Sequence, residues 1–474
     1  MVFEESPEHA LNLTTLEGQY GAALAAVGHG AVVLAGLLLY VLTTRAGRQR
    51  RHPSAALAWV LTITLFPYLG IPLFLLFGTR KLAKPASPIA LAIPAGGPAP
   101  QWAGALLAGL GVPAPSDNGH VHFHADGPAA QAALLEMVDA AARRILLATF
   151  ILSSDRIGNA VVDALVRRAR AGVAVCVLLE PLARLSSSQA QLERLRAAGV
   201  QVRWANAGRR DWINTRLNLR YHRKMVLCDD ASLWCGGRNL ADEYFTHDGA
   251  NPPWVDLSFD VRGPLAMQAS LVFDRDWRQS GGAALSFAPV TTGAAGGAPA
   301  QLVASGPDFA DENVYALLLS GAFQARERIL AVTPYFVPDD TLLVAWRLAC
   351  RRGVRVTLVV PARSNHRLAD WARGRALRDL AAAGAEIVLF PRMIHAKAMV
   401  IDGTMALCGS SNLDSRSLFL NFEMMVAFYG EREVDWLARW IHARAAESTP
   451  FNACEPSLAV DLAEGLVRVV GFQL

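Results

Sequence analysis

The sequence predicts an α/β protein of two similar lobes, each a mixed sheet flanked by helices, preceded by a pair of hydrophobic membrane helices. Three observations lead to this prediction. The first part of the chain holds two long uncharged stretches, the remainder resembles one unit written twice, and each copy has the pattern strand, helix, strand. A strand–helix–strand order with a connection of this length favours parallel pairing, and therefore an α/β lobe.

The composition fits membrane segments but does not identify a partner. The chain has 474 residues, which is enough for two or three domains. Hydrophobic residues make up 53% and charged residues 18%, an apolar balance for a soluble protein. The net charge of +4 is weak evidence for an anionic partner. The six cysteines show no Cys-x-x-Cys spacing, which predicts small buried residues rather than a zinc site or a disulfide framework.

Residues 1–82 hold the two hydrophobic stretches, predicted as membrane segments over about 18–44 and 52–79. Neither contains Asp, Glu, Lys or Arg, and each exceeds the ~20 residues needed to cross a hydrocarbon core. No Lys or Arg precedes Arg45, which argues against a cleaved signal peptide. The second stretch contains Pro67, Gly70 and Pro72, which break a helix. It therefore either spans the membrane or enters and returns as a re-entrant hairpin.

A segment rich in Pro, Ala and Gly, residues 83–127, is predicted as a linker with some docked structure. Within it, His120, His122 and His124 alternate, so a strand would place all three imidazoles on one face. Such a face could hold a metal, but no carboxylate or cysteine is identified as a partner for it. The pattern favours a surface strand, and no metal is predicted.

The two copies cover residues 128–280 and 301–474, with a Gly/Ala-rich connection over 281–300. RILLATF at 144–150 matches RILAVTP at 328–334, and an apolar strand follows each after a helical stretch. Further on, each copy repeats one motif with the same spacing: His222, Lys224, Asp229 and Asn239 in the first copy, and His395, Lys397, Asp402 and Asn412 in the second. Later still, WVDLSFDVRG matches NFEMMVAFYG, which aligns Asp256 with Glu423.

Each motif is predicted to form a hairpin that presents His, Lys and Asn on one face. Asp402-Gly403 is a strong two-residue turn signal, and counting back from it places Ser410 directly opposite His395. A matching turn at Asp229-Asp230 places Gly237 opposite His222. The two motif aspartates then lie at turns, where their expected role is to cap the turn backbone.

Asp256 and Glu423 are the better candidates for orienting the imidazoles. Each lies on the strand that follows the hairpin in its copy. A carboxylate hydrogen-bonded to one ring nitrogen sets the tautomer and leaves the other nitrogen free to react. One His-x-Lys pair alone would be an unremarkable strand pattern, but two copies with equal spacing argue against coincidence.

These residue types suit transfer at a phosphodiester. One His attacks phosphorus and forms a phosphohistidine, while the other protonates the leaving alcohol and then deprotonates the incoming nucleophile. The lysines, the asparagines and the Ser410 hydroxyl are expected to hold the non-bridging oxygens. The two lysines supply the positive charge that a metal would otherwise bring. Exchange of one phosphodiester for another is near thermoneutral, so neither a metal nor a nucleotide cofactor is expected.

The paired His-x-Lys-x4-Asp motifs resemble those of the phospholipase D superfamily. The second motif with its sequel, HAKAMVIDGTMALCGSSNLDSRSLFLNFE, is similar to the bacterial cardiolipin synthases in particular, and so are YHRKMVLCDDASLWCGGRNLADEYF and TPYFVPD. The segment AWVLTITLFPYLGIPLFLLFG resembles the membrane-anchored branch of that family. The resemblance implies two phospholipase D-like lobes that share a central site, in an integral protein of the bacterial cytoplasmic (inner) membrane.

The resemblance also implies an activity: two phosphatidylglycerol molecules give cardiolipin and glycerol. The functional residues that it transfers to this chain are His222, Lys224, Asn239, His395, Lys397, Ser410, Asn412 and Glu423. It makes His222 the expected nucleophile and His395 the acid and base, with the reverse assignment left open. The first copy has Gly237 where the second has Ser410, so the two halves are not equivalent. The expected partners are membrane phospholipids, phosphatidylglycerol and cardiolipin, and not nucleic acid; protein partners are left open.

Two other activities could use the same residues. A phospholipase D-type hydrolase, or a transphosphatidylase with another acceptor such as phosphatidylethanolamine, would need the same motifs. A nuclease of the same superfamily would need an exposed basic groove and no membrane segments, so the two hydrophobic stretches count against it.

Overall fold

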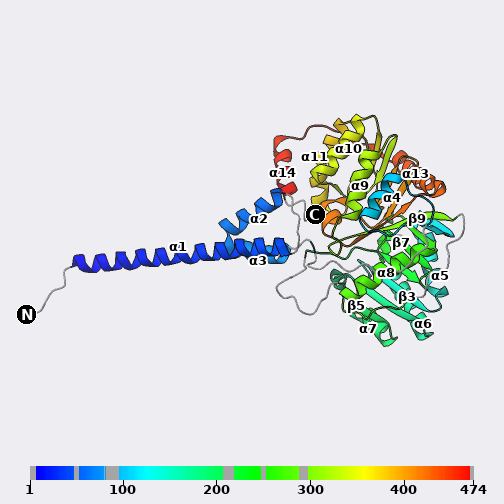
Figure 1. The fold of residues 1–474 in the computed structure, drawn as a ribbon, viewed down its shortest axis with the longest axis horizontal. Helices are drawn as coiled ribbons and strands as arrows, with labels where there is room; N and C mark the ends of the chain where they lie inside the picture. Colours follow the sequence, from blue (N-terminus) through cyan, green and yellow to red (C-terminus); the bar gives the residue numbers. More distant parts are fainter. Residues whose placement is uncertain are drawn as a thin grey trace, which may run out of the picture. The chain divides into compact units, whose positions relative to one another are not determined.

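The computed structural model describes residues 7–46, 53–78, 81, 96–205, 218–246, 252–287 and 297–469 (Figure 1). The chain divides into two compact units. One unit comprises Met1–Lys84 and Asp211–Asn218, and the other comprises Pro85–Arg210 and Leu219–Leu474. The larger unit contains all the repeated motifs.

The smaller unit contains α1 (Pro7–Ala46), α2 (Pro53–Leu65) and α3 (Pro67–Phe77). Within α1, residues Tyr20–Arg45 form a helix long and apolar enough to cross a membrane, judged by length and composition. The expected second membrane helix over 52–79 is wrong as a single helix, because the described part breaks at Phe66. Pro67 lacks the N–H that would continue α2, and its ring restricts Phe66 to the non-helical φ of −135° that it adopts. Residues 52 and 79 themselves lie outside the described residues.

The two short helices α2 and α3 fold back on each other. A side chain at Gly70 of α3 would place its Cβ 2.7 Å from the carbonyl oxygen of Thr62 in α2. This close approach needs a glycine, because any larger residue would push the two helices apart. In the described part of the smaller unit, therefore, one helix of spanning length accompanies a short helical hairpin rather than a second spanning helix.

The larger unit contains two mixed sheets, which confirms the predicted α/β class. The seven-stranded sheet has the order β2 (His120–His124), β8 (Ser258–Arg262), β7 (Ser232–Gly236), β6 (Met225–Cys228), β3 (Arg144–Thr149), β4 (Ala174–Leu179) and β5 (Gln201–Trp204). The nine-stranded sheet has the order β1 (Ser116–Asn118), β9 (Ala298–Ser305), β17 (Glu423–Phe428), β15 (Met405–Gly409), β14 (Ala398–Ile401), β10 (Arg328–Val332), β12 (Arg355–Pro361), β13 (Glu386–Phe390) and β18 (Thr449–Pro450). A small pair, β11 (Phe336–Val337) and β16 (Leu413–Asp414), accompanies it.

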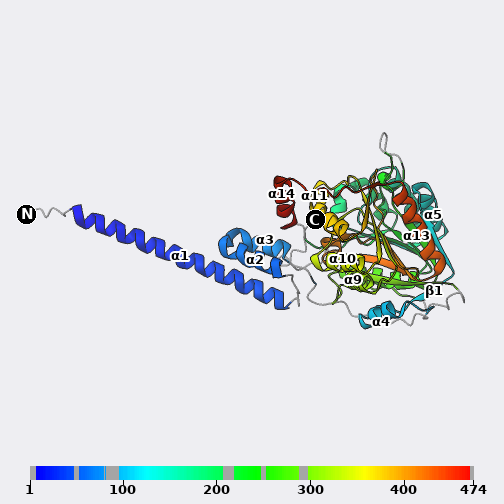
Figure 2. The same cartoon turned by 90° about the horizontal axis from the view of Figure 1, so that it is seen from above.

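Helices cover both sheets and bury an apolar core in each lobe (Figures 1 and 2). In the first lobe they are α5 (Gly127–Ala140), α6 (Arg156–Arg170), α7 (Gln189–Ala197) and α8 (Pro264–Gln279), with the 3₁₀ turns η1 (Pro181–Leu185) and η2 (Asp242–Tyr244). In the second they are α9 (Asn313–Gln324), α10 (Asp340–Arg351), α11 (Arg367–Ala382), α12 (Ser415–Phe419), α13 (Glu431–Ala446) and α14 (Leu458–Val469). Two equivalent helices start on an aspartate: the side chain of Asp155 caps α6, and that of Asp339 caps α10.

The internal repeat is visible in the strand pairing. In the first lobe β3 pairs parallel to β4 and antiparallel to β6, and in the second β10 pairs parallel to β12 and antiparallel to β14. Small contacts repeat as well: Thr149 and Thr333 each donate a 2.9 Å hydrogen bond to the carbonyl oxygen two residues later. The two copies therefore share their local contacts as well as their sequence motifs.

The segment predicted as a linker, residues 83–127, contributes to both sheets where it is described. It forms α4 (Gln101–Gly109) and β1 on the nine-stranded sheet, and β2 on the seven-stranded sheet. Of the predicted connection 281–300, residues 288–296 lie outside the described residues, and β9 begins at Ala298. The predicted division into domains stays a prediction.

The hairpin register differs by one residue from the sequence prediction. Ile401 pairs with Met405 rather than facing Thr404, so the turn holds three residues and Ser410 is not directly opposite His395. Cys228 pairs with Ser232 in the same way, which moves Gly237 away from the position opposite His222.

The extra turn residue has a physical reason in the motif aspartates. Asp229 and Asp402 adopt left-handed backbone conformations, with φ of 56° and 53°. In this conformation the Asp229 carboxylate accepts hydrogen bonds from the backbone N–H groups of Ala142, Arg143 and Arg144. The Asp402 carboxylate likewise accepts from the three N–H groups of residues 326–328. Both aspartates thus fix the hairpin turn to the start of a central strand.

We predict that Asp402→Ala destabilises the second lobe without removing its chemistry. Loss of hydrogen bonds to a charged carboxylate should lower the thermal unfolding midpoint by roughly 5–10 °C. Thr404→Ala, in the same exposed turn, is the matched control and should leave the midpoint unchanged. Circular dichroism in detergent measures both. A normal midpoint combined with lost turnover in Asp402→Ala would instead give this aspartate a catalytic role.

Candidate active site

Both motif histidines lie at the same ends of equivalent strands. β6 and β14 run antiparallel to β3 and β10, so the residues that precede them lie beyond the carboxyl ends of these central strands. His222 and His395 each occupy this position, three residues before their strand. Ligand sites in α/β sheets commonly form at the carboxyl ends of parallel strands.

Each histidine is held by a carboxylate from the opposite lobe. Nδ1 of His222 lies 2.9 and 3.1 Å from the two carboxylate oxygens of Glu423. Nδ1 of His395 lies 2.7 Å from Oδ2 of Asp256. The candidates for orienting the imidazoles are therefore in place, but the strand that follows each hairpin serves the histidine of the other copy. Both carboxylates are fully buried.

Backbone hydrogen bonds also join the two lobes next to each histidine. The N–H of His222 donates to the carbonyl of Phe422 at 3.0 Å, and the N–H of His395 donates to the carbonyl of Val255 at 2.7 Å. Each contact joins a motif to the residue just before the carboxylate that orients it. The two lobes thus meet in a locally repeated arrangement around the histidines.

Ser410 and Gly237 explain why the halves are not equivalent. The Ser410 hydroxyl donates a 2.5 Å hydrogen bond to Oε2 of Glu423, so it positions the carboxylate that holds His222. A Cβ at Gly237 would lie 2.2 Å from Oδ1 of Asp256, which leaves no room for a serine there. The first lobe supplies the shorter side chain, Asp256, beside Gly237. The second lobe supplies the longer side chain, Glu423, which the Ser410 hydroxyl fixes. The expected role of Ser410 as a direct phosphate ligand stays a prediction.

Arg223, one of the arginines that flank the motifs in the sequence, is a positioning residue held by ion pairs. It lies between His222 and Lys224, but its side chain points to the opposite face, where it is fully buried. The guanidinium bonds to Asp276 at 2.5 Å, to Asp308 at 3.2 Å and to the backbone carbonyl of Glu423 at 3.1 Å. Burial lowers the pKa of Arg223, but the two aspartates outweigh it and raise this pKa. The network joins the first motif to the second lobe; the second motif has Ala396 at the corresponding position.

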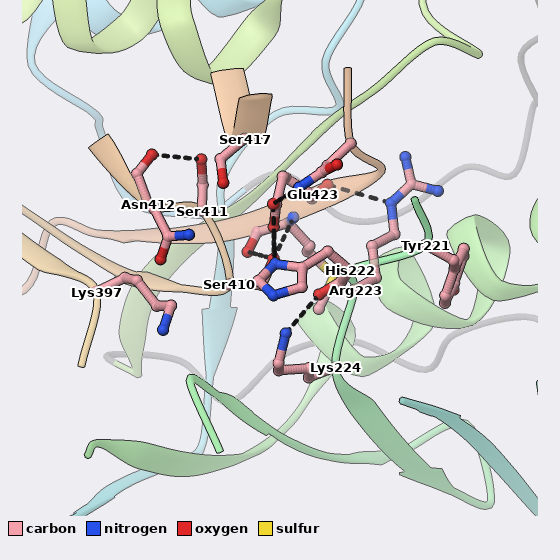
Figure 3. A network of polar contacts seen from close by, with 12 residues as sticks. Tyr221, His222, Arg223, Lys224, Lys397, Ser410, Ser411, Asn412, Ser417 and Glu423 are labelled. Carbon is pink, nitrogen blue, oxygen red and sulfur yellow. Dashed lines mark hydrogen bonds and ion pairs between the residues drawn. The ribbon is translucent and has the colours of Figure 1, made fainter. Parts of the chain in front are cut away.

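Two buried lysines face this site without a carboxylate partner among the described residues. Lys224 is 1% exposed and Lys397 is 2% exposed. Lys224 Nζ donates to the His222 carbonyl at 3.0 Å, and Lys397 Nζ lies 2.9 Å from Nε2 of His395. Figure 3 shows both amino groups on the side of the His222 ring away from Glu423. Burial lowers the pKa of Lys224 to about 7 and that of Lys397 to about 8, because a charged amine loses its hydration there.

Both imidazoles have lowered pKa values and are neutral at physiological pH. Burial lowers the pKa of His222 to about 4 and that of His395 to about 3, and the nearby lysine charges act in the same direction. Burial alone would raise the pKa of Asp256 and Glu423. The paired histidines and the lysines outweigh that effect and lower both pKa values, so the carboxylates stay ionised. With Nδ1 donating to Glu423, the Nε2 lone pair of His222 is free to attack an electrophile.

The two motif asparagines lie where unsatisfied polar groups remain. Nδ2 of Asn239 donates to the Tyr244 hydroxyl at 2.8 Å. The side-chain oxygens of Asn239 and Asn412 are buried and have no hydrogen-bond partner among the described residues. A buried amide oxygen without a partner is costly, and equivalent ones in both copies indicate a polar site that a ligand completes.

Aromatic rings pack against both imidazoles. Phe150 contacts His222 edge-on with a centroid separation of 5.1 Å, and Tyr244 contacts His395 in the same way at 5.0 Å. Trp254 lies on another side of His395 at 5.7 Å. These rings remove water from the imidazoles and account for much of their burial. Phe150 is the last residue of RILLATF, the segment that is repeated as RILAVTP in the second copy. This repeat was the sequence signal that could have marked Phe150 as a site residue.

The alternating histidines of β2 do not form a metal site as placed. β2 pairs with β8, which brings Asp260 opposite His122; its carboxylate contacts Nε2 of His124 at 2.8 Å and Nε2 of His120 at 3.3 Å. The expectation that no carboxylate lies near these histidines is wrong in three dimensions, because the strand pairing supplies one. Across the described parts of the chain, no group of three or more His, Cys, Asp and Glu side chains is placed to hold a metal ion.

Comparison with known families identifies the class. Residues 134–277 and 319–444 match the family described as cardiolipin synthase, PLD-like domain, and residues 32–78 match the phospholipase D-nuclease N-terminal family. The two PLD-like matches cover more than half of the chain and include both motifs. The chain therefore belongs to the cardiolipin synthase family with PLD-like domains.

Relatives agree over most of the length. The chain is 28% identical to a cardiolipin synthase of Oceanobacillus iheyensis over 464 residues, which cover 89% of this chain and 94% of the relative. It is 29% identical to cardiolipin synthase A of Escherichia coli over 422 residues, which cover 82% of this chain and 86% of the relative. The crystal structure of phosphatidylserine synthase from Haemophilus influenzae superposes with a TM-score of 0.59, covering 79% of this chain and all of that one. At 14% identity this likeness shows a shared fold alone.

We predict a pH profile of kcat/KM that is set by the buried histidine and lysine. This parameter reports groups of the free enzyme. It should fall below about pH 4 as His222 gains a proton and loses its lone pair. Above that pH it should decline gradually, because His395 must take up a proton that it lacks in the free enzyme, and a steeper basic limb should begin at about pH 7 as Lys224 loses its charge.

Lys224→Arg retains a cation at every relevant pH. Its residual kcat/KM should keep the acid limb, while the basic limb moves up toward the Lys397 value of about 8. Initial rates across pH in mixed micelles measure both profiles. An identical basic limb in the variant would contradict the assignment to Lys224.

Proposed function

We propose that this protein is a membrane-anchored cardiolipin synthase that transfers a phosphatidyl group between two phosphatidylglycerol molecules through a phosphohistidine. The observation that carries the proposal is a pair of carboxylate-held imidazoles beside two buried lysines that lack ionic partners in the described chain. Buried cations without partners favour an anion, and two imidazoles at the same edge of the two sheets suit an in-line displacement at phosphorus. The membership of the family supports the choice of lipid substrate.

In the first step, Nε2 of His222 attacks the phosphorus of one phosphatidylglycerol. The bond from phosphorus to the headgroup glycerol oxygen breaks, and His395 donates its proton to that oxygen, which releases glycerol. The anionic phosphodiester raises the pKa of His395 when it binds, so this histidine can carry the proton. Lys224, Lys397 and the two motif asparagines stabilise the negative charge on the non-bridging oxygens.

The assignment of His222 as nucleophile has structural support. Its Nε2 makes no hydrogen bond to any described residue, and Glu423 is itself held by Ser410 and Asn421. The Lys397 amine, by contrast, lies 2.9 Å from Nε2 and 2.8 Å from Nδ1 of His395, so this histidine has a group beside it that can exchange protons. The swapped assignment gives the same products and differs in which histidine carries the phosphatidyl group.

In the second step, a headgroup hydroxyl of another phosphatidylglycerol attacks the phosphohistidine. Its proton passes to His395, the phosphorus–nitrogen bond breaks, and cardiolipin forms. Water would compete for the same intermediate, so the aromatic rings around the histidines protect the transfer by limiting water access.

The single spanning helix of α1 would hold the site at the inner membrane, with α2 and α3 as a re-entrant hairpin. This anchoring would keep the local substrate concentration high.

The direct test supplies the purified protein with phosphatidylglycerol alone in mixed micelles, without nucleotide, and follows the products by mass spectrometry. Cardiolipin with an equal amount of free glycerol is expected. Phosphatidic acid without cardiolipin would make the protein a phospholipase, or would mean that a second lipid such as phosphatidylethanolamine is the missing acceptor.

His222→Ala and His395→Ala should each lower turnover on the order of a thousand-fold or more.

A substrate with a better leaving group separates the two histidines. Phosphatidyl-p-nitrophenol needs no proton on its leaving group, so His395→Ala should still release nitrophenolate in a burst equal to one enzyme equivalent and retain a covalent lipid. His222→Ala should give no burst. The opposite pattern would exchange the two roles, and a burst from neither variant would contradict the covalent mechanism.

A further inference from the structure

In the part of α14 whose side chains are described, leucines point outward and the two acidic side chains pair with Arg378 of α11. Leu458 and Leu462, one helical turn apart, are 76% and 65% exposed. On the other side, Glu464 accepts a 2.5 Å bond from Arg378 of α11 and packs against Gly374. A helix on a water-exposed surface has the reverse arrangement, with its polar side outward. The apolar side of α14 therefore faces an environment other than water.

The neighbouring helix α11 continues this apolar surface. Figures 1 and 2 both show α14 beside α11. At the start of α11, Leu368 and Trp371 are 52% and 56% exposed. Exposed Arg367 and Arg375 lie on the same helix face, one residue before Leu368 and one turn after Trp371. Tryptophan and arginine beside exposed leucines are typical of a surface that meets the interface of an anionic bilayer.

The first lobe has an equivalent apolar projection. η1 follows β4 and the start of α11 follows β12, so both segments come directly after equivalent strands, although the helical counterpart of α11 in the repeat is α7, which follows η1. Within η1, Leu182 is 42% exposed and Leu185 is 87% exposed. Both copies thus carry outward-facing apolar side chains at the same place in the fold.

This place is the edge of the sheets at which the histidines lie. η1 and the start of α11 follow the carboxyl ends of β4 and β12, and the motif histidines lie beyond the carboxyl ends of the adjacent β3 and β10. Tyr335, two residues beyond Thr333, donates a 2.5 Å hydrogen bond to Asn365 in the segment that leads into α11. The exposed apolar residues of η1 and α11 therefore lie at the same edge of the two sheets as the motif histidines.

We propose that these residues form an apolar rim that docks onto the surface of an anionic phospholipid bilayer and turns the active site toward the lipid. The rim comprises Leu182, Leu185, Leu368, Trp371, Leu458 and Leu462. The inference rests on the proposed function only in taking the substrate to be a membrane lipid. A second copy of the chain is the other occupant such a surface could have, but at this edge it would cover the approach to both histidines. The flanking arginines also match anionic headgroups.

The first test places an environment-sensitive fluorophore on the full-length protein in nanodiscs that contain phosphatidylglycerol. Cys454 is the exposed native cysteine, so Cys454→Ser provides the background, and Leu462→Cys and Leu185→Cys carry the label in separate proteins. Thr404→Cys is the matched control, because this exposed turn of the β14–β15 hairpin lies at the opposite ends of the strands from the histidines. The rim labels should shift to shorter emission wavelength and lose fluorescence to doxyl-labelled lipid, while the control should do neither.

The second test measures turnover. Leu462→Asp and Leu185→Asp should lower the rate on long-chain phosphatidylglycerol in nanodiscs on the order of ten-fold, because each removes one apolar anchor. The rate on monomeric dihexanoyl phosphatidylglycerol should stay unchanged, since this substrate reaches the site from water.

The outcomes are distinguishable. Rim labels that doxyl lipid does not quench overturn the docking proposal, and energy transfer between labels on different copies would assign the rim to self-association instead. Equal loss on both substrates would mean that the substitutions damage the fold and would also contradict it. Quenched labels on a protein that makes no cardiolipin would sustain the docking and reject the proposed function.

Discussion

The exchange of carboxylates between the lobes is the constraint on which the site depends. Glu423 of the second lobe orients His222 of the first, and Asp256 of the first orients His395 of the second. Neither lobe alone has a complete imidazole–carboxylate pair, so a competent site exists only when both lobes associate. The backbone bridges at Phe422 and Val255 and the buried Arg223 network hold the lobes at the distance that the exchange needs.

The electrostatics of the site favour an anionic substrate. Two lysines are buried close to two neutral imidazoles, and their lowered pKa values record the cost of keeping charge away from water. A phosphodiester bound between them would restore a counter-charge and raise the pKa values of the lysines and of His395 together. Substrate binding and readiness for proton transfer are thereby coupled. Asp256 and Glu423 stay ionised throughout because each is held by its histidine.

The sequence was sufficient for the class of fold and the repeat, because equal spacing in two copies is a strong local signal. The roles of the reacting groups that the same motifs name stay a prediction. The carboxylate pairing was not accessible, since it is set by contacts between residues about two hundred positions apart, such as His222 with Glu423. The hairpin register was misjudged because Asp402 uses its side chain to hold the next strand, which adds a residue to the turn. The second membrane helix was overestimated because apolar composition continues across the break at Pro67.

The exchange of carboxylates can be tested most directly by nitrogen NMR of protein labelled with ¹⁵N-histidine, with Glu423→Gln and Asp256→Asn measured separately. The account predicts that Glu423→Gln changes the ring-nitrogen shifts and titration of His222 alone, while Asp256→Asn changes those of His395 alone. The His222→Ala and His395→Ala proteins assign the signals. A response of His222 to Asp256→Asn, or of His395 to Glu423→Gln, would contradict the exchange and place each carboxylate with the histidine of its own lobe.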